Sequence, residues 1–300
     1  MNSEAVMTLP HCNELLLDLN EGVLNLTLNR PHKRNAMNNA MVCELMAVFE
    51  SIEANRAIRA VVMRGAQGNF CAGGDISDMS KDSQEGSESS PELSPSKLSP
   101  SNQSPSNQSP SNQSSATLRD ATWHFNRSFG KLIAKVNRAP QLVICILEGA
   151  VLGGGFGLAC VSDLAIAKPS AMFAMPETGL GIIPAQIAPF VIARIGLTQA
   201  RRLTLLGERL DGHTALELGI IHHVADDTEA VLARNLKIFK KCAPNATAVT
   251  KQLLLDAAER PDMEPLLDRA SDDFSKAMLS DEGQEGTTAF IQKRKPSWCN

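Results

Sequence analysis

The order of the hydrophobic patterns along the 300 residues constrains the fold of this chain more than any single motif does. As far as about residue 174, short apolar runs of the kind found in strands alternate with stretches of helical spacing. From residue 185 onward, nearly all of the apolar residues recur at helical spacing. Strand–helix repeats followed by consecutive helices predict an α/β core with a helical C-terminal part.

Several strands and helices can be placed from these patterns. Apolar and polar residues alternate over residues 14–20 and again over residues 23–29. The two runs are joined by Glu21-Gly22, which predicts a β-hairpin. Helical spacing predicts helices over residues 36–57 and 121–136, and apolar runs predict buried strands over residues 60–64 and 141–147. Further helices are predicted over residues 187–195, 197–206, 213–218, 229–242, 246–259, 265–279 and 281–293.

Residues 80–115 differ from the rest of the chain because they contain mostly Ser, Pro, Asn, Gln and Glu. The pentad Ser-Pro-Ser-Asn-Gln begins there at Ser99, Ser104 and Ser109. With so little apolar surface, the segment cannot compensate for the entropy lost on ordering, so we expect a disordered insertion; a partner-binding motif is the alternative. The sequence thus predicts one core domain formed by residues 1–79 and 116–205, interrupted by the insertion, and a helical region at residues 206–300.

Charge and cysteine usage indicate the compartment and exclude some partners. A formal net charge of −4 argues against nucleic acids and anionic membranes, which need a clustered positive face. Seven scattered cysteines fit a reducing compartment better than a disulfide framework. No secretory signal or bilayer-spanning apolar run is visible. The sequence therefore predicts a cytoplasmic protein with no nucleic-acid or membrane partner.

Two glycine-rich turns, at residues 65–76 and 148–159, each follow a predicted strand. Glycine suits positions where the backbone itself approaches a ligand or takes a positive φ. The second turn leads directly into the helix-like residues 156–161, so free N–H groups and the helix dipole would favour negative charge there. The alternative is that both are tight turns that serve packing only. Neither turn matches the dinucleotide-binding pattern or the Lys-bearing phosphate-loop pattern.

Residues 173–184 place one ionisable residue, Glu177, among apolar residues and glycines. Burial would raise the pKa of its carboxyl group and make it a proton carrier near neutral pH; a surface or salt-bridged glutamate is the alternative. Cys71 has no paired base in the sequence, so we expect it to be inert. The adjacent His222 and His223 would point apart and lack a carboxylate partner, so we expect no metal site.

Taken together, these segments resemble the crotonase superfamily of enoyl-CoA hydratases and isomerases, from about residue 15 to residue 296. The order and spacing of several motifs carry the resemblance. They are Leu28-Asn29-Arg30-Pro31, Asn35-Ala36-Met37, Phe70-Cys71-Ala72-Gly73-Gly74-Asp75-Ile76, Gly153-Gly154-Gly155, Ser162-Asp163, Pro176-Glu177, Gly179-Leu180-Gly181 and Ala289-Phe290. The resemblance implies a ββα superhelical core and a helical C-terminal region that mediates trimerisation, giving a homotrimer or a dimer of trimers.

The resemblance also implies which residues form the active site. The N–H groups of Gly74 and Gly154 would form an oxyanion hole for the thioester oxygen, each worth roughly 3–4 kcal/mol of transition-state stabilisation. Glu177 would act as the acid/base. Coenzyme A enters as part of the substrate thioester, so no separate cofactor is expected. The residues expected to contact the coenzyme A thioester are Arg34, Ala72, Asp75, Ile76 and Lys293.

One position departs from the pattern of typical hydratases, which carry a first glutamate shortly after the glycine triplet. This chain has Gly157 there and keeps only Glu177. Water addition then needs another group to hold the water, and single-glutamate relatives include Δ3,Δ2-enoyl-CoA isomerases. We expect a lyase that hydrates the C2=C3 bond of an enoyl-CoA; an isomerase and a non-catalytic acyl-CoA-binding protein are the alternatives.

Within the superfamily, residues 153–163 and 184–198 are similar to the isohexenylglutaconyl-CoA hydratases of acyclic terpene degradation. That likeness implies a branched or carboxylated acyl chain and a role in fatty acid or terpenoid degradation. A buried carboxylate needs a cation or several donors facing it. We expect such a cation from Arg119, His124 or Arg127; solvated charges on an outer face are the alternative.

Overall fold

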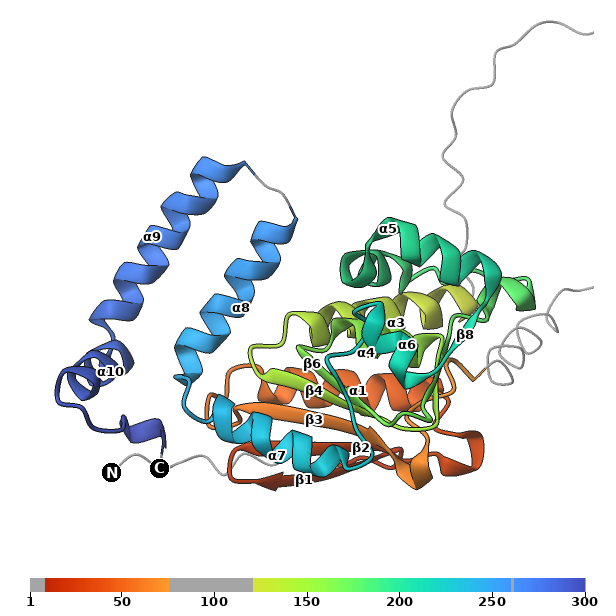
Figure 1. Ribbon diagram of the computed structural model, residues 1–300, viewed down its shortest axis with the longest axis horizontal. Coiled ribbons are helices and arrows are strands. Elements are labelled where there is room, and N and C mark those ends of the chain that lie inside the picture. Colours follow the sequence, from red (N-terminus) through yellow and green to blue (C-terminus); the bar gives the residue numbers. More distant parts are fainter. Residues whose placement is uncertain (1–8, 76–120, 260–261, 300) are drawn as a thin grey trace, which may run out of the picture.

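A six-stranded sheet forms the centre of the part of the protein that the computed structural model describes, residues 9–75, 121–259 and 262–299 (Figure 1). β1 and β2 form the predicted antiparallel hairpin, and every other neighbouring pair is parallel. The strand order is β1 (Leu15–Asn20), β2 (Val23–Leu28), β3 (Ala60–Gly65), β4 (Leu142–Leu147), β6 (Leu164–Ala167) and β9 (His223–Val224). The mixed α/β fold expected from the sequence is confirmed.

Successive side chains of the central strands point to opposite faces of the sheet, and helices cover both faces. Val61 and Met63 of β3 belong to the main hydrophobic core, which also contains residues of helices α1 (Asn39–Ile52), α3 (Ala121–Asn137) and α4 (Gly154–Val161). Val62 belongs to a second cluster with Leu232 of α7 (Thr228–Phe239). Because both faces are buried, β3 and β4 show continuous apolar runs instead of alternation.

A small second sheet pairs β5 (Ala150–Leu152), β7 (Met172–Ala174) and β8 (Arg209–Leu210). β5 ends at the glycine triplet, and β7 precedes the segment that carries Glu177. Because β5 and β7 pair in parallel, the two segments that follow them leave the sheet at the same edge. These strands have only two or three residues, which is too short for a sequence pattern to predict.

Helices dominate the chain after residue 187, as predicted. The two helices predicted on either side of residue 196 are halves of α5 (Ala188–Leu206), which is kinked at Gly196, where φ is +73°. The remaining helices are α6 (Gly212–Glu217), α8 (Pro244–Ala258), α9 (Met263–Leu279) and α10 (Asp281–Ile291). In the described ranges, no helix is both long and apolar enough to cross a bilayer.

Helices α9 and α10 stand apart from the sheet and its covering helices, whereas α8 is joined to the core, for example by the Lys251–Asp163 ion pair (Figure 1). Large apolar side chains on α9 and α10 are exposed, including Phe274 (69%), Leu279 (76%) and Phe290 (84%). Exposed apolar surface of this kind indicates an interaction surface. Trimerisation through residues 206–300 and the boundary near residue 205 stay predictions. The predicted insertion at residues 80–115 lies outside the described residues.

Candidate active site

A cavity of about 540 Å³ opens where the two glycine-rich turns, α3 and the segment after β7 meet. Gly73, Gly74, Gly153, Gly154 and Glu177 all lie on its wall, so the structure brings together the three elements that the sequence singled out. Most of the other wall residues are apolar; they include Met37, Phe125, Phe129, Leu180, Ile182 and Ile187.

Backbone hydrogen bonds hold the two glycine-rich turns side by side. The Cys71 N–H donates to the Ala150 carbonyl at 2.8 Å, and the Leu152 N–H donates to the Cys71 carbonyl at 2.9 Å. The approach is so close that a Cβ on Gly155 would lie 2.7 Å from the Cys71 carbonyl oxygen. Gly153 has a φ of +49°, a backbone conformation that residues with a Cβ rarely adopt. The glycines therefore allow two backbone segments to meet at one end of the cavity.

The N–H groups of Gly74 and Gly154 have no hydrogen-bond acceptor among the described residues. Both neighbours of Gly74 are paired with Met37: the Met37 N–H donates to the Gly73 carbonyl at 2.8 Å, and the Asp75 N–H donates to the Met37 carbonyl at 2.9 Å. Gly154 is the first residue of α4, where the N–H groups have no intrahelical partner and the helix dipole is positive. Two donors are thus available on one wall.

Glu177 begins the 3-10 helix η3 (Glu177–Leu180), directly beside the glycine triplet. Its Oε1 atom lies so near Gly153 that a Cβ on that residue would be only 2.9 Å away. Its Oε2 atom is buried and has no hydrogen-bond partner in the described structure. Burial raises the pKa of the Glu177 carboxyl, which is the direction predicted from the sequence.

The raised pKa of Glu177 predicts how the stability of the folded protein depends on pH. The unfolded chain loses the Glu177 proton near the ordinary carboxyl pKa, below the pKa of the folded protein. The stability of the wild type should therefore decrease as the pH rises from about 4.5 through the raised pKa. Glu177→Gln has no proton to lose at this position, so we expect its free energy of unfolding to be independent of this titration. The difference in free energy of unfolding between the variant and the wild type should therefore shift in favour of the variant as the pH rises through this range. Urea unfolding at a series of pH values measures it; parallel curves for the two proteins would contradict the prediction.

The position of the absent first glutamate is filled by other side chains. A Cβ on Gly157 would lie 2.4 Å from Cγ2 of Ile187 and 3.0 Å from Cδ1 of Ile133. Gly157 is one of the buried residues of α4. The packing of the core therefore leaves no room for a glutamate at residue 157, because Ile187 occupies the space that its side chain would need.

A pair of amide side chains lies on the cavity wall next to Ile187. Nε2 of Gln186 donates to Oδ1 of Asn126 on α3 at 2.9 Å, and both residues line the cavity. Gly130, one turn after Asn126, makes room for this pair, since a Cβ there would lie 1.8 Å from Oε1 of Gln186. Sequence reasoning missed the pair. The Asn126–Gly130 spacing on one helix face was the available signal, but its partner lies 60 residues away.

Of the residues predicted to contact coenzyme A, some lie at the cavity and others do not. Ala72 lines the cavity, and its N–H donates to the Arg34 carbonyl at 3.0 Å, which places the exposed Arg34 beside the first turn. Asp75 does not line the cavity; its buried carboxylate pairs with Arg30 at 3.0 Å instead. Lys293 is exposed after α10 and is not part of the cavity wall. Ile76 lies outside the described residues.

The other candidates have no direct role in the cavity. His124 and Arg127 are exposed and do not line it, which favours the outer-face alternative, and Arg119 lies outside the described residues. Burial raises the pKa of the Cys71 thiol to about 12, so it is not a nucleophile. Across the described ranges, no group of three or more His, Cys, Asp or Glu side chains could hold a metal ion.

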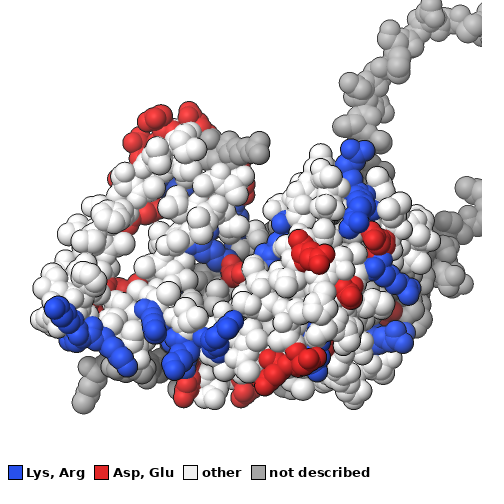
Figure 2. All heavy atoms as spheres, viewed as in Figure 1, with Lys and Arg blue, Asp and Glu red and all other residues white. Residues whose placement is uncertain are grey.

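A larger cleft, of about 870 Å³, lies away from the glycine-rich turns, between the β1–β2 hairpin, α7 and the C-terminal segment. Figure 2 shows basic side chains gathered along this side of the molecule. The basic residues that line the cleft are Lys237, Lys240, Lys241, Arg294 and Lys295. Lys240 is paired with Glu21, and Arg294 with Glu285. None of the predicted catalytic residues faces this cleft, so the smaller cavity is the candidate active site.

Known proteins match the chain in sequence and in structure. The family model described as enoyl-CoA hydratase/isomerase matches residues 23–231. The solved structure of Pseudomonas aeruginosa AtuE is 49% identical, with a TM-score of 0.83, and the match covers 96% of this chain and 100% of that one. Two Escherichia coli proteins are each 29% identical: a 1,2-epoxyphenylacetyl-CoA isomerase (95% of this chain, 97% of the relative) and a 2,3-dehydroadipyl-CoA hydratase (95% and 98%).

Proposed function

The chain belongs to the enoyl-CoA hydratase/isomerase family, and from that premise we propose that it adds water across the C2=C3 bond of an enoyl-CoA thioester. One observation carries the proposal: the N–H groups of Gly74 and Gly154, which have no acceptor among the described residues, share a largely apolar cavity with Glu177, whose carboxyl group has a raised pKa. Donors of this kind suit an oxygen on which negative charge develops, and a partly buried carboxyl group with a raised pKa, as at Glu177, suits proton transfer.

The reaction uses these groups in a fixed order. The thioester oxygen accepts hydrogen bonds from Gly74 and Gly154. A water oxygen bonds to C3 while Glu177 takes a proton from that water, and the C2=C3 electrons move toward the thioester oxygen to form an enolate. Glu177 then returns this proton to C2, and the thioester carbonyl re-forms in the 3-hydroxyacyl-CoA product. Each hole donor contributes roughly 3–4 kcal/mol to the transition state.

With Gly157 in place of a second carboxylate, we assign the holding of the water to the Asn126–Gln186 pair, which lines the same cavity as Glu177. Replacing Gln186 by Leu removes one neutral hydrogen-bonding group, worth about 0.5–1.5 kcal/mol. We expect turnover to fall by about two- to tenfold on every enoyl-CoA tested, with KM nearly unchanged. Steady-state kinetics on crotonyl-CoA and on a carboxylated enoyl-CoA measure this. A loss confined to the carboxylated substrate would contradict it and assign the pair to the acyl chain.

We further propose that the acyl chain is branched or carboxylated, as in fatty acid or terpenoid degradation. The apolar wall formed by residues such as Phe129, Ile182 and Ile187 supports a bulky hydrocarbon part. The name of the 2,3-dehydroadipyl-CoA hydratase supports a distal carboxylate.

The rest of the proposal concerns coenzyme A and assembly. Arg34 and Ala72 lie together beside the cavity, which supports coenzyme A binding at the first glycine-rich turn. The exposed apolar side chains of α9 and α10 support a homotrimer or a dimer of trimers, in which Lys293 would reach the coenzyme A of a neighbouring subunit. The thioester brings its own coenzyme A, so the proposed reaction uses no separate cofactor.

An enoyl-CoA isomerase is the second candidate, because the described cavity wall holds a single carboxylate and a relative is named an isomerase. Supplying a trans-2-enoyl-CoA and the matching trans-3-enoyl-CoA separately distinguishes the two. A hydratase forms the 3-hydroxyacyl-CoA from the 2-enoyl substrate. Interconversion of the two enoyl thioesters without any hydroxyacyl product would favour the isomerase. A protein that binds both thioesters and converts neither would favour a non-catalytic role.

A further inference from the structure

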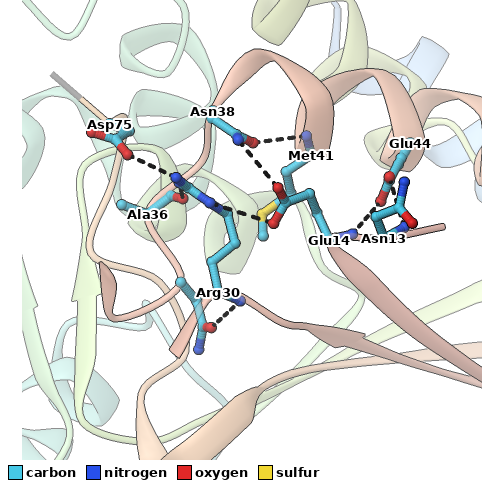
Figure 3. Close-up of polar contacts among 9 residues, drawn as sticks. Asn13, Glu14, Arg30, Ala36, Asn38, Met41, Glu44 and Asp75 are labelled. Carbon is cyan, nitrogen blue, oxygen red and sulfur yellow. Dashed lines mark hydrogen bonds and ion pairs between the residues drawn. The ribbon is translucent and has the colours of Figure 1, made fainter. Parts of the chain in front are cut away.

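The side chain of Arg30 joins the two backbone segments that flank the Gly74 N–H (Figure 3). Its Nη1 atom donates to the Ala36 carbonyl at 2.5 Å, and its Nη2 atom donates to Oδ2 of Asp75 at 3.0 Å. Ala36 precedes Met37, and Asp75 follows Gly74. Arg30 and Asp75 are each only 6% exposed, so solvent does not compete for these contacts. The guanidinium thus links the same two segments, residues 36–37 and 73–75, that are already joined by the backbone hydrogen bonds of Met37.

This bridge extends to both predicted hole donors through Met37. The backbone of Met37 pairs with the Gly73 carbonyl and the Asp75 N–H, which fixes the peptide group that carries the Gly74 N–H and the peptide group that follows it. The side chain of Met37 packs against Gly154, because a Cβ there would lie 2.5 Å from Cε of Met37. A shift of residues 36–37 would therefore move one donor directly and disturb the wall beside the other.

The neighbours of Arg30 hold it in place. The backbone N–H of Arg30 donates to Oδ1 of Asn35 at 2.9 Å, and Nδ2 of Asn35 donates to the carbonyl of Asn69 in the first glycine-rich turn. Nε of Arg30 lies 3.4 Å from Oε2 of Glu14, and Asn38 donates to the other oxygen of that carboxylate at 3.4 Å (Figure 3). A single guanidinium with a fixed fork can satisfy these directions at once, which an ammonium group cannot.

The charge of Arg30 matters as well as its shape. The carboxylate of Asp75 belongs to the residue next to a predicted hole donor, and an unpaired negative charge there would oppose the negative charge that develops on the thioester oxygen. Pairing with Arg30 neutralises it within a buried site.

We propose that Arg30 is a positioning residue of the oxyanion hole, which fixes the Gly74 N–H through Ala36 and Asp75 and neutralises the carboxylate beside it. The inference rests on the oxyanion hole of the proposed function, but not on whether the enolate leads to hydration or isomerisation.

The test measures how strongly the bound thioester carbonyl is polarised. A 4-(dimethylamino)cinnamoyl-CoA probe absorbs at longer wavelength when its carbonyl oxygen accepts strong hydrogen bonds, so the absorbance shift at saturation reports on the hole itself. The variants are Arg30→Lys, which keeps the charge but loses the fork, and the double variant Arg30→Met with Asp75→Asn, which leaves no unpaired Asp75 charge. For both we expect a red shift smaller than that of the wild type, with the Kd of the probe within about threefold. We expect kcat to fall by about 10²-fold, the cost of a donor misplaced by about 1 Å.

Arg138→Met is the matched control, since Arg138 also bridges two partners, Asp256 and Glu259, but does not line the cavity. We expect it to keep the wild-type shift even where its melting temperature decreases. A wild-type shift and kcat in either folded Arg30 variant would overturn the proposal, as would an equal loss of shift in Arg138→Met. A wild-type protein that binds the probe with no shift would contradict the oxyanion hole on which it rests.

Discussion

We expect Glu177→Gln to reduce the turnover of an enoyl-CoA thioester by at least about 10²-fold while leaving its affinity nearly unchanged. The substitution keeps the shape of a side chain that packs against Gly153 but removes the group that takes the proton. General acid/base catalysis contributes roughly 10²–10⁴-fold, which sets the expected size. Steady-state kinetics give kcat, and calorimetry with a saturated acyl-CoA gives the affinity.

Glu148→Gln provides a control for this measurement, because Glu148 begins the glycine-rich turn against which Glu177 packs but pairs with Lys168 and does not line the cavity. Its turnover should stay within about twofold of the wild type, since exposed ion pairs contribute little. Near-normal turnover in Glu177→Gln would remove Glu177 from the mechanism. A comparable loss in both variants would indicate a general effect on the turn.

We expect Gly157→Glu, which restores the glutamate of typical hydratases, to decrease the free energy of unfolding by about 3 kcal/mol or more and to give no gain in turnover. The new Cβ would lie 2.4 Å from Ile187, so the core must shift. A carboxylate enclosed without a partner adds a desolvation cost. Urea unfolding of the purified variant measures the loss.

Two further variants test the reason for this loss. Gly179→Ala is the matched glycine control, because a Cβ at residue 179 meets no atom within 4 Å and should change stability little. Adding Ile187→Gly to Gly157→Glu removes the clashing side chain and should recover part of the stability. Full stability and increased hydration in Gly157→Glu alone would contradict the packing seen around α4.

The sequence predicted the main elements and much of the site because those features are local. The hairpin of β1 and β2, the buried strands β3 and β4, and the long helices follow from patterns within each segment. Gly74, Gly154 and Glu177 share one cavity, as expected from the turns that contain them. Gly157 was recognised as a departure, but its packing against Ile187 depends on a contact 30 positions away in the chain.

The features that sequence reasoning missed depend on tertiary contacts. Strands as short as β5 and β8 form because neighbours offer backbone partners, and their own sequences have no period to detect. The polarity of the cavity comes from Gln186 and Asn126, which pair across 60 residues of sequence and need Gly130, on the same helix as Asn126, to make room for the Gln186 side chain. Asp75 was expected to contact coenzyme A, yet its carboxylate faces Arg30, 45 residues earlier. No local pattern distinguishes a carboxylate that faces a ligand from one that pairs inside the protein.

The proposed hydration is tested most directly by the fate of the water oxygen. The purified protein is incubated with a trans-2-enoyl-CoA in water enriched in heavy oxygen, and the product is examined by mass spectrometry. We expect a 3-hydroxyacyl-CoA that carries the label at C3 in the wild type, and no label above background in Glu177→Gln. Formation of an isomeric enoyl-CoA without label, or no conversion of any enoyl-CoA in a panel with branched and carboxylated chains, would contradict the proposed function.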